Sequence, residues 1–300
     1  MSKLKPWLSA IRLRTLPLSV SGIIIGTCFV YYNGFFNIFI LILAILTTIS
    51  LQILSNLAND YGDGVKGTDN ANRVGPERAI QSGSITPDQM FEAIKINILI
   101  IILLVFLLIY ASFGTGHFLY TLLFIGLAGF SVYAAMSYTI GNKAYGYKGL
   151  GDLFVFVFFG FVSVVGSYFL YTRNLSHQVF LPAITVGLLS VGVLNLNNMR
   201  DIDSDKQSNK LTLAVKMGHK KSKIYHLFLI IGAIVSSLLF VILYYSSFFN
   251  LLCVLAYIPL IIHIKSIIKA KTPADFDSQL KVLALTTFAF SLLLGFGYIL

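Results

Sequence analysis

Two short acidic runs contain the residues of this chain that are best suited to chemistry. The chain has 300 residues but only twelve Asp and Glu, and six of the twelve lie in these two runs or shortly after the first. The first run covers residues 56–63, with Asp69 shortly after it, and the second covers residues 197–205. In each run an Asn is followed four residues later by an Asp, a spacing that places both side chains on one face of a helix. Each run therefore predicts a patch of oxygen ligands.

The ligand types in the two runs indicate which cation they would bind. Carboxylate and amide oxygens are hard ligands, which favour Mg²⁺, Mn²⁺ or Ca²⁺ over zinc or copper. In proteins Mg²⁺ is usually held by one or two carboxylates and by phosphate oxygens of the substrate. Lys and Arg residues lie beside both runs and would neutralise the remaining phosphate charge. If the two runs face each other, they predict a site for a metal–diphosphate complex.

The electrostatics of helix ends indicates that these aspartates have a role beyond solvating the ends of helices. Both runs come at the C-terminal end of a long apolar stretch, where the helix dipole is negative and carboxylates are disfavoured. Aspartates three or four residues apart also repel each other. A sequence that breaks local rules at two matching places usually does so for function. Bound cations would offset both penalties.

The elements that must position these runs are membrane-spanning helices. The sequence is 57% hydrophobic with a mean hydropathy of +0.83, which excludes a soluble globular protein. A transmembrane helix needs about 20 mostly apolar residues. Nine such stretches predict an all-α integral membrane protein with a single domain over residues 1–300. The predicted spans are residues 17–34, 37–59, 94–113, 117–138, 152–171, 179–199, 225–245, 248–267 and 281–300.

The basic residues predict the orientation of these spans. Lys and Arg precede the first span and follow the even-numbered ones, whereas the odd-numbered connections carry only Arg173. By the positive-inside rule the N-terminus is cytoplasmic and the C-terminus is outside, and we expect the chain in the cell inner membrane. The net charge of +10 then reflects the basic loops that orient the protein in a lipid bilayer. Nucleic acid is not expected as a partner, because the basic residues are divided among separate short loops.

A weak internal repeat predicts how the two runs meet. The longest polar interruptions, residues 60–92 and 200–224, follow the second and sixth spans, and Pro87 suits the start of a short helix in the first of them. Parallel halves would bring both acidic ends together around a central cavity that opens at the cytoplasmic side. A diphosphate site there suggests a lipid diphosphate whose tail lies between the helices. The aromatic cluster at residues 154–159 could stabilise a carbocation.

Particular motifs add a resemblance to a known family. The segment Asn59-Asp60-Tyr-Gly-Asp63 resembles the NDxxD-type motif of the UbiA superfamily of intramembrane prenyltransferases, and Asp201 to Asp205 resembles its DxxxD motif. Within that superfamily the chain is most similar to the 1,4-dihydroxy-2-naphthoate polyprenyltransferase family of menaquinone biosynthesis. The stretches that carry this resemblance are residues 12–18, 59–78, 147–156 and 197–215.

The resemblance implies a reaction and a set of site residues. A polyprenyl group would pass from polyprenyl diphosphate to 1,4-dihydroxy-2-naphthoate, with loss of CO₂ and diphosphate, to give demethylmenaquinol. Two Mg²⁺ ions, or Mn²⁺ in their place, would bind the diphosphate. The implied metal ligands are Asn56, Asp60, Asp63, Asn197, Asp201 and Asp205. The implied catalytic residues are Asp60, Asp63, Asp69, Asp201 and Asp205. The implied substrate-binding residues are Asn56, Asn59, Arg73, Arg78, Tyr138, Lys148, Asn197, Arg200 and Lys206.

Departures from the family pattern leave parts of this assignment open. In the NxxxDxxxD spacing of other members Gly64 occupies the third place, so either Asp63 or Asp69 completes the first metal site. The Tyr-x-x-x-Lys pair of other members is broken, because Lys143 falls one residue late. The base that acts on the aromatic acceptor is not identified by any sequence feature. Candidates for that base, or for further metal ligands, are Asp69, Asp152 and Asp203.

Two alternative functions remain. A UbiA-type enzyme could use another aromatic acceptor such as 4-hydroxybenzoate, haem or a chlorophyll precursor, although the stretches at residues 67–69 and 74–76 favour the naphthoate. A secondary transporter would also have many spans in a parallel repeat. Transporters, however, bind their ions near the bilayer midplane, whereas both acidic runs are predicted at one membrane face.

Overall fold

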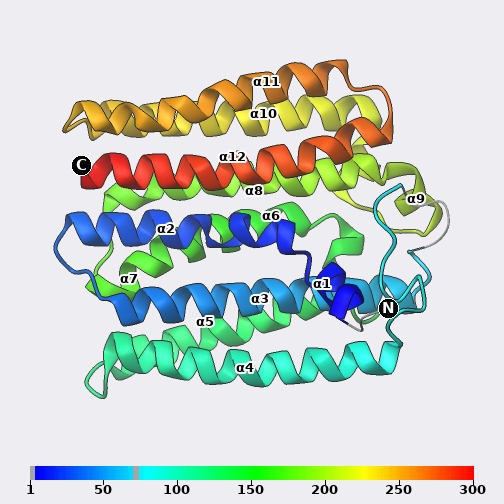
Figure 1. The fold of residues 1–300 in the computed structure, drawn as a ribbon, viewed down its shortest axis with the longest axis horizontal. Coiled ribbons are helices and arrows are strands. Elements are labelled where there is room, and N and C mark those ends of the chain that lie inside the picture. Colours follow the sequence, from blue (N-terminus) through cyan, green and yellow to red (C-terminus); the bar gives the residue numbers. More distant parts are fainter. Residues whose placement is uncertain (1–3, 70–73) are drawn as a thin grey trace.

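The regular elements of the described chain are all helices, and most of them lie side by side along the longest dimension of the molecule (Figure 1). The computed structural model describes residues 4–69 and 74–300. The elements are α1 (Leu4–Ile11), η1 (Leu13–Thr15), α2 (Leu16–Tyr32), α3 (Ile38–Val65), α4 (Pro87–Phe113), α5 (Phe118–Ser137), η2 (Tyr145–Lys148), α6 (Gly151–Val155), η3 (Phe156–Gly166), α7 (Ser167–Thr172), η4 (His177–Val179), α8 (Phe180–Arg200), α9 (Ile202–Gln207), α10 (Leu213–Leu243), η5 (Phe248–Ala256), α11 (Tyr257–Lys269) and α12 (Pro273–Ile299).

Nine segments of the described chain are long and apolar enough to cross a membrane. This number confirms the predicted all-α class with nine spans. Four of the spans are single helices without a break, namely α3, α4, α5 and α12. The first span joins α1 to α2, and the fifth joins α6, the π-helical segment η3 and α7.

Three helices begin clearly earlier than the hydropathy of the sequence predicts, and one of them, α10, begins at Leu213 rather than at residue 225. α4 begins at Pro87, so the short helix predicted there is the first turn of a long one. α12 begins at Pro273 rather than at residue 281. Thr86 and Thr272 each form a capping box with the third residue of the helix that follows. Such caps start a helix in polar residues, which a search for apolar stretches leaves out.

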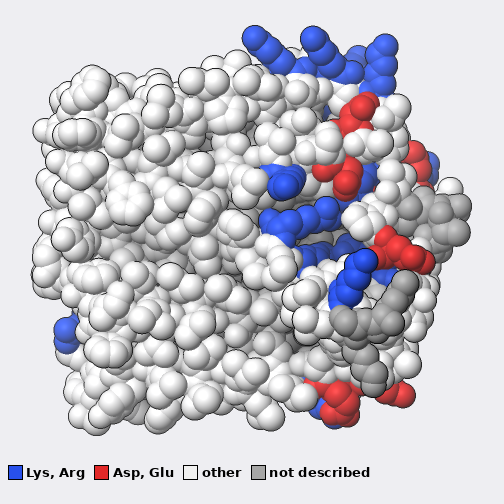
Figure 2. Space-filling view, viewed as in Figure 1, with Lys and Arg blue, Asp and Glu red and all other residues white. Residues whose placement is uncertain are grey.

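The outer surface of the bundle is apolar and its charges lie at the ends. Large side chains such as Leu99, Phe106, Phe118, Phe228 and Ile242 are exposed, as expected for a multi-pass membrane protein whose helices contact lipid. Figure 2 shows Lys, Arg, Asp and Glu gathered at one end of the molecule, with one small basic patch at the opposite end. α1, with which the described chain begins, lies at this charged end, and the C-terminus lies at the opposite end (Figure 1). That the charged end faces the cytoplasm stays a prediction.

The fifth span approaches α8 very closely at a glycine. A Cβ atom added at Gly160 would lie 2.6 Å from the carbonyl oxygen of Ala183 and 3.0 Å from Cα of Gly187. Contacts of this kind between small residues are typical of helix interfaces in membranes. The close approach fixes η3 against α8. It thereby sets the position of Phe158 and Phe159, two η3 residues that line the cavity described below.

Replacing Gly160 by Ala should weaken this interface. The added methyl group would meet backbone atoms of α8, which cannot rotate away, so we expect a loss of about 1–3 kcal/mol in the free energy of unfolding. The measurement is the thermal unfolding midpoint of the purified protein in detergent. Gly129→Ala on α5 is the matched control, because a Cβ there meets nothing within 4 Å. Equal midpoints for the two variants would contradict the close contact.

Candidate active site

The last turns of α3 carry the first acidic run. Asn56, Asn59 and Asp63 are three or four residues apart and form one stripe along the helix. This stripe lines a cavity of about 380 Å³. Thr139, which follows α5, donates its hydroxyl hydrogen to the carbonyl oxygen of Ala58 at 2.9 Å. This bond fastens the end of α3 to the end of the fourth span.

The second acidic run occupies the end of α8 and the short helix α9. α8 ends at Arg200, and Asp201 joins it to α9. Asn197, Asp201 and Asp205 are again four residues apart, and all three line the same cavity as the first run. Asp201 and Asp205 are buried. The structure therefore brings side chains from the ends of the second and sixth spans to one cavity.

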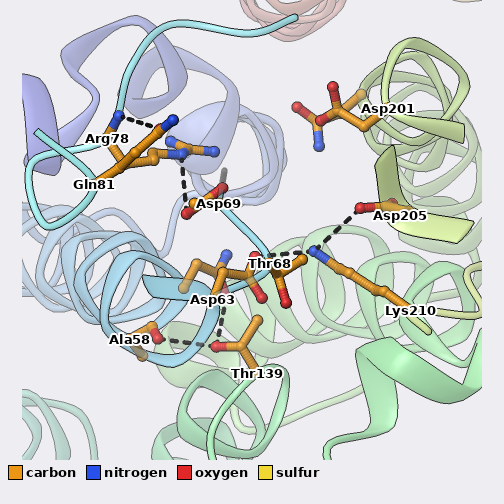
Figure 3. A network of polar contacts seen from close by, with 12 residues as sticks. Ala58, Asp63, Thr68, Asp69, Arg78, Gln81, Thr139, Asp201, Asp205 and Lys210 are labelled. Carbon is orange, nitrogen blue, oxygen red and sulfur yellow. Dashed lines mark hydrogen bonds and ion pairs between the residues drawn. The ribbon is translucent and has the colours of Figure 1, made fainter. Parts of the chain in front are cut away.

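Lys210 lies between the two runs (Figure 3). Its Nζ donates to Oδ2 of Asp63 at 2.9 Å and lies 3.9 Å from Oδ1 of Asp205. Burial alone would lower the pKa of Lys210, but the two carboxylates outweigh burial and raise this pKa. Lys210 is therefore a fixed positive charge between the acids. Lys206, the lysine predicted to bind substrate, is exposed and does not line the cavity.

A short chain of hydroxyl groups holds the other oxygen of Asp63. Tyr147 donates its hydroxyl hydrogen to Oδ1 of Asp63 at 2.8 Å, and the hydroxyl of Thr68 lies 2.6 Å from the same tyrosine oxygen. Because the Tyr147 hydrogen points at Asp63, Thr68 is the donor in the second bond. Burial and the charge of Asp63 raise the pKa of Tyr147, so the phenol stays protonated. Neither residue was predicted as part of the site. Thr68 is an uncharged residue just after α3, and Tyr147 lies in η2, with no spacing that relates it to α3.

Arg200 binds residues of the second run from outside the cavity lining. Its Nε and Nη2 donate to the two carboxylate oxygens of Asp201 at 2.8 and 2.6 Å. Nη2 also donates to Oδ1 of Asn197 at 2.8 Å, and Nη1 donates to Oδ1 of Asp277 at 2.5 Å. Arg200 is only 2% exposed and does not line the cavity. Arg200 was predicted to bind substrate, and Asp277, which lies in the first turns of α12, was not among the predicted site residues.

The other predicted binding residues are divided between the cavity and its surroundings. Asp69 and Arg78 both line the cavity, with Nε of the arginine 3.9 Å from Oδ2 of the aspartate; Figure 3 shows them beside Asp63. Tyr138 also lines it, and burial raises the pKa of its phenol to about 12. Lys148 is exposed and does not line the cavity. Arg73 lies outside the described residues.

Asp60 lies on a different side of α3 from the cavity stripe. Together with Arg12, Arg14 and Arg78 it lines a smaller neighbouring pocket, and it is not part of the lining of the larger cavity. Asp60 is 1% exposed, and neither of its carboxylate oxygens has a hydrogen-bond partner among the residues that the structure describes. Its role as a metal ligand stays a prediction.

Of the three candidate bases, only Asp69 lies at the cavity. The carboxylate of Asp152 accepts a hydrogen bond from the hydroxyl of Tyr225 at 3.0 Å. Asp203 is exposed, 3.2 Å from Nε2 of His219. Neither Asp152 nor Asp203 lines the cavity, whereas Asp69 does.

The remainder of the cavity extends along the spans and is lined mainly by apolar side chains, with a few hydroxyl groups such as those of Thr47 and Ser163 among them. Next to the polar end, the rings of Tyr145 and Phe154 are stacked with centroids 4.0 Å apart. Phe158 and Phe159 continue this aromatic wall, and Leu170 of α7 lines the cavity near the far end of the fifth span. The aromatic cluster noted in the sequence therefore forms part of the cavity wall.

The ligand atoms at the polar end fit a hard divalent cation. The candidate ligand atoms there are carboxylate and amide oxygens. The described lining contains neither Cys nor His, so it supplies no thiolate or imidazole ligand. Within the described residues no three Asp, Glu, His or Cys side chains are arranged to hold a metal ion as they stand. The ammonium of Lys210 occupies the position between Asp63 and Asp205. A divalent cation would meet the same attraction there.

Comparison with known proteins gives close relatives. Residues 19–285 match the model of the UbiA prenyltransferase family. The chain is 44% identical to 1,4-dihydroxy-2-naphthoate octaprenyltransferase of Escherichia coli (strain K12) over 240 residues, which cover 80% of this chain and 77% of the relative. It is 37% identical to the protein of the same name from Haemophilus influenzae, over 99% of this chain and 97% of that relative.

A solved structure shares the fold. A UbiA homolog from Archaeoglobus fulgidus, bound to GPP and Mg²⁺, matches 98% of this chain and 99% of its own with a TM-score of 0.67. The sequences are 11% identical, so this similarity concerns the fold alone. The family model and the sequence relatives confirm the resemblance seen in the two acidic runs. The chain belongs to the UbiA prenyltransferase family.

Proposed function

We propose that the chain transfers a polyprenyl group from a polyprenyl diphosphate to 1,4-dihydroxy-2-naphthoate, with release of diphosphate and CO₂, to give demethylmenaquinol. The two bacterial relatives described above carry the name of such an activity. The observation that best supports the proposal is the cavity, which has acidic and basic side chains at one end and mainly apolar ones along the rest. A prenyl diphosphate has the same division into a charged head and an apolar tail.

The charged end of the cavity suits a diphosphate that is bound together with divalent metal. Mg²⁺, or Mn²⁺ in its place, would supply positive charge to the leaving diphosphate when bound, and ligands from two runs suit two ions. The residues that would hold the metal are the predicted ligands that line the cavity, namely Asn56, Asp63, Asn197, Asp201 and Asp205, together with Asn59 and Asp69 of the same lining. Asp60, the remaining predicted ligand, lines the neighbouring pocket. Lys210 and Arg78 would neutralise further charge on the diphosphate. Tyr138 keeps its proton, so it can donate a hydrogen bond there.

The boundary between the charged and apolar parts suits the bond changes. The C–O bond of the allylic diphosphate breaks and its electron pair leaves with the diphosphate. The electron-rich naphthoate ring forms the new C–C bond, and its carboxylate leaves as CO₂. Tyr145, Phe154 and Phe158 line this part of the cavity, and aromatic rings there would stabilise positive charge on the prenyl group. The apolar lining keeps water away from that charge.

The direct test is the reaction itself. Purified protein in lipid should convert a polyprenyl diphosphate and 1,4-dihydroxy-2-naphthoate to the prenylated quinol, CO₂ and diphosphate. EDTA should stop the reaction and added Mg²⁺ should restore it, because the carboxylates need a divalent cation to bind the diphosphate. Full turnover after exhaustive EDTA treatment would exclude the metal role. Prenylation of 4-hydroxybenzoate but not of the naphthoate would establish the alternative acceptor.

Two aspartates on α9 provide a matched pair of variants. Asp205 is buried at the cavity, whereas Asp203 is exposed on the same short helix. Asp205→Asn should lower the rate of prenyl transfer roughly 100-fold or more, the scale seen when one electrostatic group is lost from an active site. Asp203→Asn should stay within about twofold of the unmodified protein. Similar rates for the two variants would contradict the assignment of Asp205.

Two lysines in the same segment test the link between the runs. Lys210→Met leaves Asp63 and Asp205 buried without their cation, so the metal-free protein should lose about 3–5 kcal/mol in the free energy of unfolding. Mg²⁺ should recover part of this loss, because it neutralises the same carboxylates. Lys206→Met is the control, since Lys206 is exposed. Thermal unfolding with EDTA and with Mg²⁺ measures both effects, and equal stability of the two metal-free variants would refute the bridge.

A further inference from the structure

Arg200 lies between two carboxylates that come from different spans. Asp201 follows Arg200 at the end of the sixth span and accepts two of its hydrogen bonds, at 2.8 and 2.6 Å. Asp277 on α12, the ninth span, accepts a third at 2.5 Å. The Asn197 amide oxygen accepts a fourth at 2.8 Å. A guanidinium has five N–H groups, so most of its donors are engaged by protein oxygens rather than directed at substrate.

The main chain covers the same guanidinium. A Cβ atom added at Gly75 would lie 2.8 Å from Cζ and Nη2 of Arg200. The loop before α4 therefore rests directly on the arginine. Arg200 is held by α8 and α12 and is covered by this loop, which explains why it is only 2% exposed.

Arg200, Asp201 and Asp277 together carry a net negative charge. One guanidinium carries a single positive charge, while Asp201 and Asp277 together carry two negative charges. Without Asp277, the positive charge of Arg200 would neutralise Asp201 alone. The bidentate contact between these two residues is a strong charge-assisted hydrogen bond. With Asp277 present, Asp201 can keep part of its negative charge for a cation on the cavity side.

We propose that Asp277 is a positioning residue for the metal site: by binding Arg200, it fixes the orientation of Asp201 and Asn197 and preserves negative charge on Asp201. This inference rests on the proposed function, because it concerns the metal that the acidic runs would hold. Asp277 does not line the cavity itself, but Leu280, Lys281 and Ala284 of the same helix do. α12 thus forms part of the cavity wall and also carries the residue that orients its ligands.

The first turns of α12 offer a control for general effects on the helix. Asp275 accepts hydrogen bonds at 2.8 Å from the backbone N–H groups of Lys271 and Thr272 and caps the helix, but it makes no contact with Arg200 that the structure records. Asp275 and Asp277 are two residues apart and carry the same charge. Asn at either position removes one charge at almost unchanged size.

The experiment is a titration of the purified protein in detergent with Mn²⁺. The electron paramagnetic resonance signal of unbound Mn²⁺ in the presence of the protein gives the Kd. Asp277→Asn should raise the Kd for Mn²⁺ roughly tenfold, the lower end of the range for residues that orient metal ligands. Asp275→Asn should leave it within about twofold. Asp277→Glu, which keeps the charge, should recover most of the affinity. An unchanged Kd for Asp277→Asn, or an equal rise for both Asn variants, would overturn the proposal.

A second variant covers the case in which Asp277→Asn does not fold. Gly75→Ala leaves both carboxylates in place but forces the guanidinium to move, so it should also raise the Kd for Mn²⁺; an unchanged Kd with a folded protein would count against the proposal. Failure of the unmodified protein to bind Mn²⁺ would instead overturn the metal site of the proposed function. The two failures are therefore distinguishable.

Discussion

The burial of like charges from two distant spans is the constraint on which the polar end of this protein depends. At an effective dielectric constant of about 20, two unit charges about 4 Å apart interact by about 4 kcal/mol. Carboxylates from the two acidic runs can therefore share a buried space only if cations lie between them. Lys210 supplies one such charge between Asp63 and Asp205, and Arg200 supplies another between Asp201 and Asp277.

Charged side chains at this end also order the connections between the spans. Lys66, which follows α3, donates to the carbonyl oxygens of Thr139 and Gly141 at 2.7 and 2.9 Å, so the loop after the fourth span is tied to the end of the second. That loop continues to Tyr147, whose hydroxyl binds Asp63. The loop before α4 covers Arg200 at Gly75. These contacts tie the described parts of the polar loops to the ends of the spans.

Hydropathy and residue spacing are sufficient to predict the nine spans, the two acidic runs and the kind of ion they favour. They are not sufficient to predict which side of a helix faces the cavity. Successive residues on a helix are about 100° apart, so the neighbours Asn59 and Asp60 point in different directions, and the packing of α3 decides between them. Only Asn59 lines the large cavity.

The basic partners were harder to predict than the acids. Lys206 lies on α9, but α9 ends at Gln207, and the chain then turns back so that the backbone N–H of Lys210 bonds the carbonyl oxygen of Asp205 at 2.8 Å. This turn, and not distance along the sequence, brings Lys210 to the acids. Asp277 was missed because a polar capping box starts α12 before its apolar part. Long-range packing therefore determines two of the ion pairs, Lys210 with Asp63 and Arg200 with Asp277.

The separation of the cavity into a charged end and an apolar length has a consequence for direction. Both proposed substrates are anions, and each can be anchored by its negative group at the polar end. Turnover removes the diphosphate from one and the carboxylate from the other, so the joined product has no anionic group left for that end to hold. Its apolar surface is then better solvated by lipid than by water. Chemistry at the charged end thus converts two retained molecules into one that partitions into the bilayer.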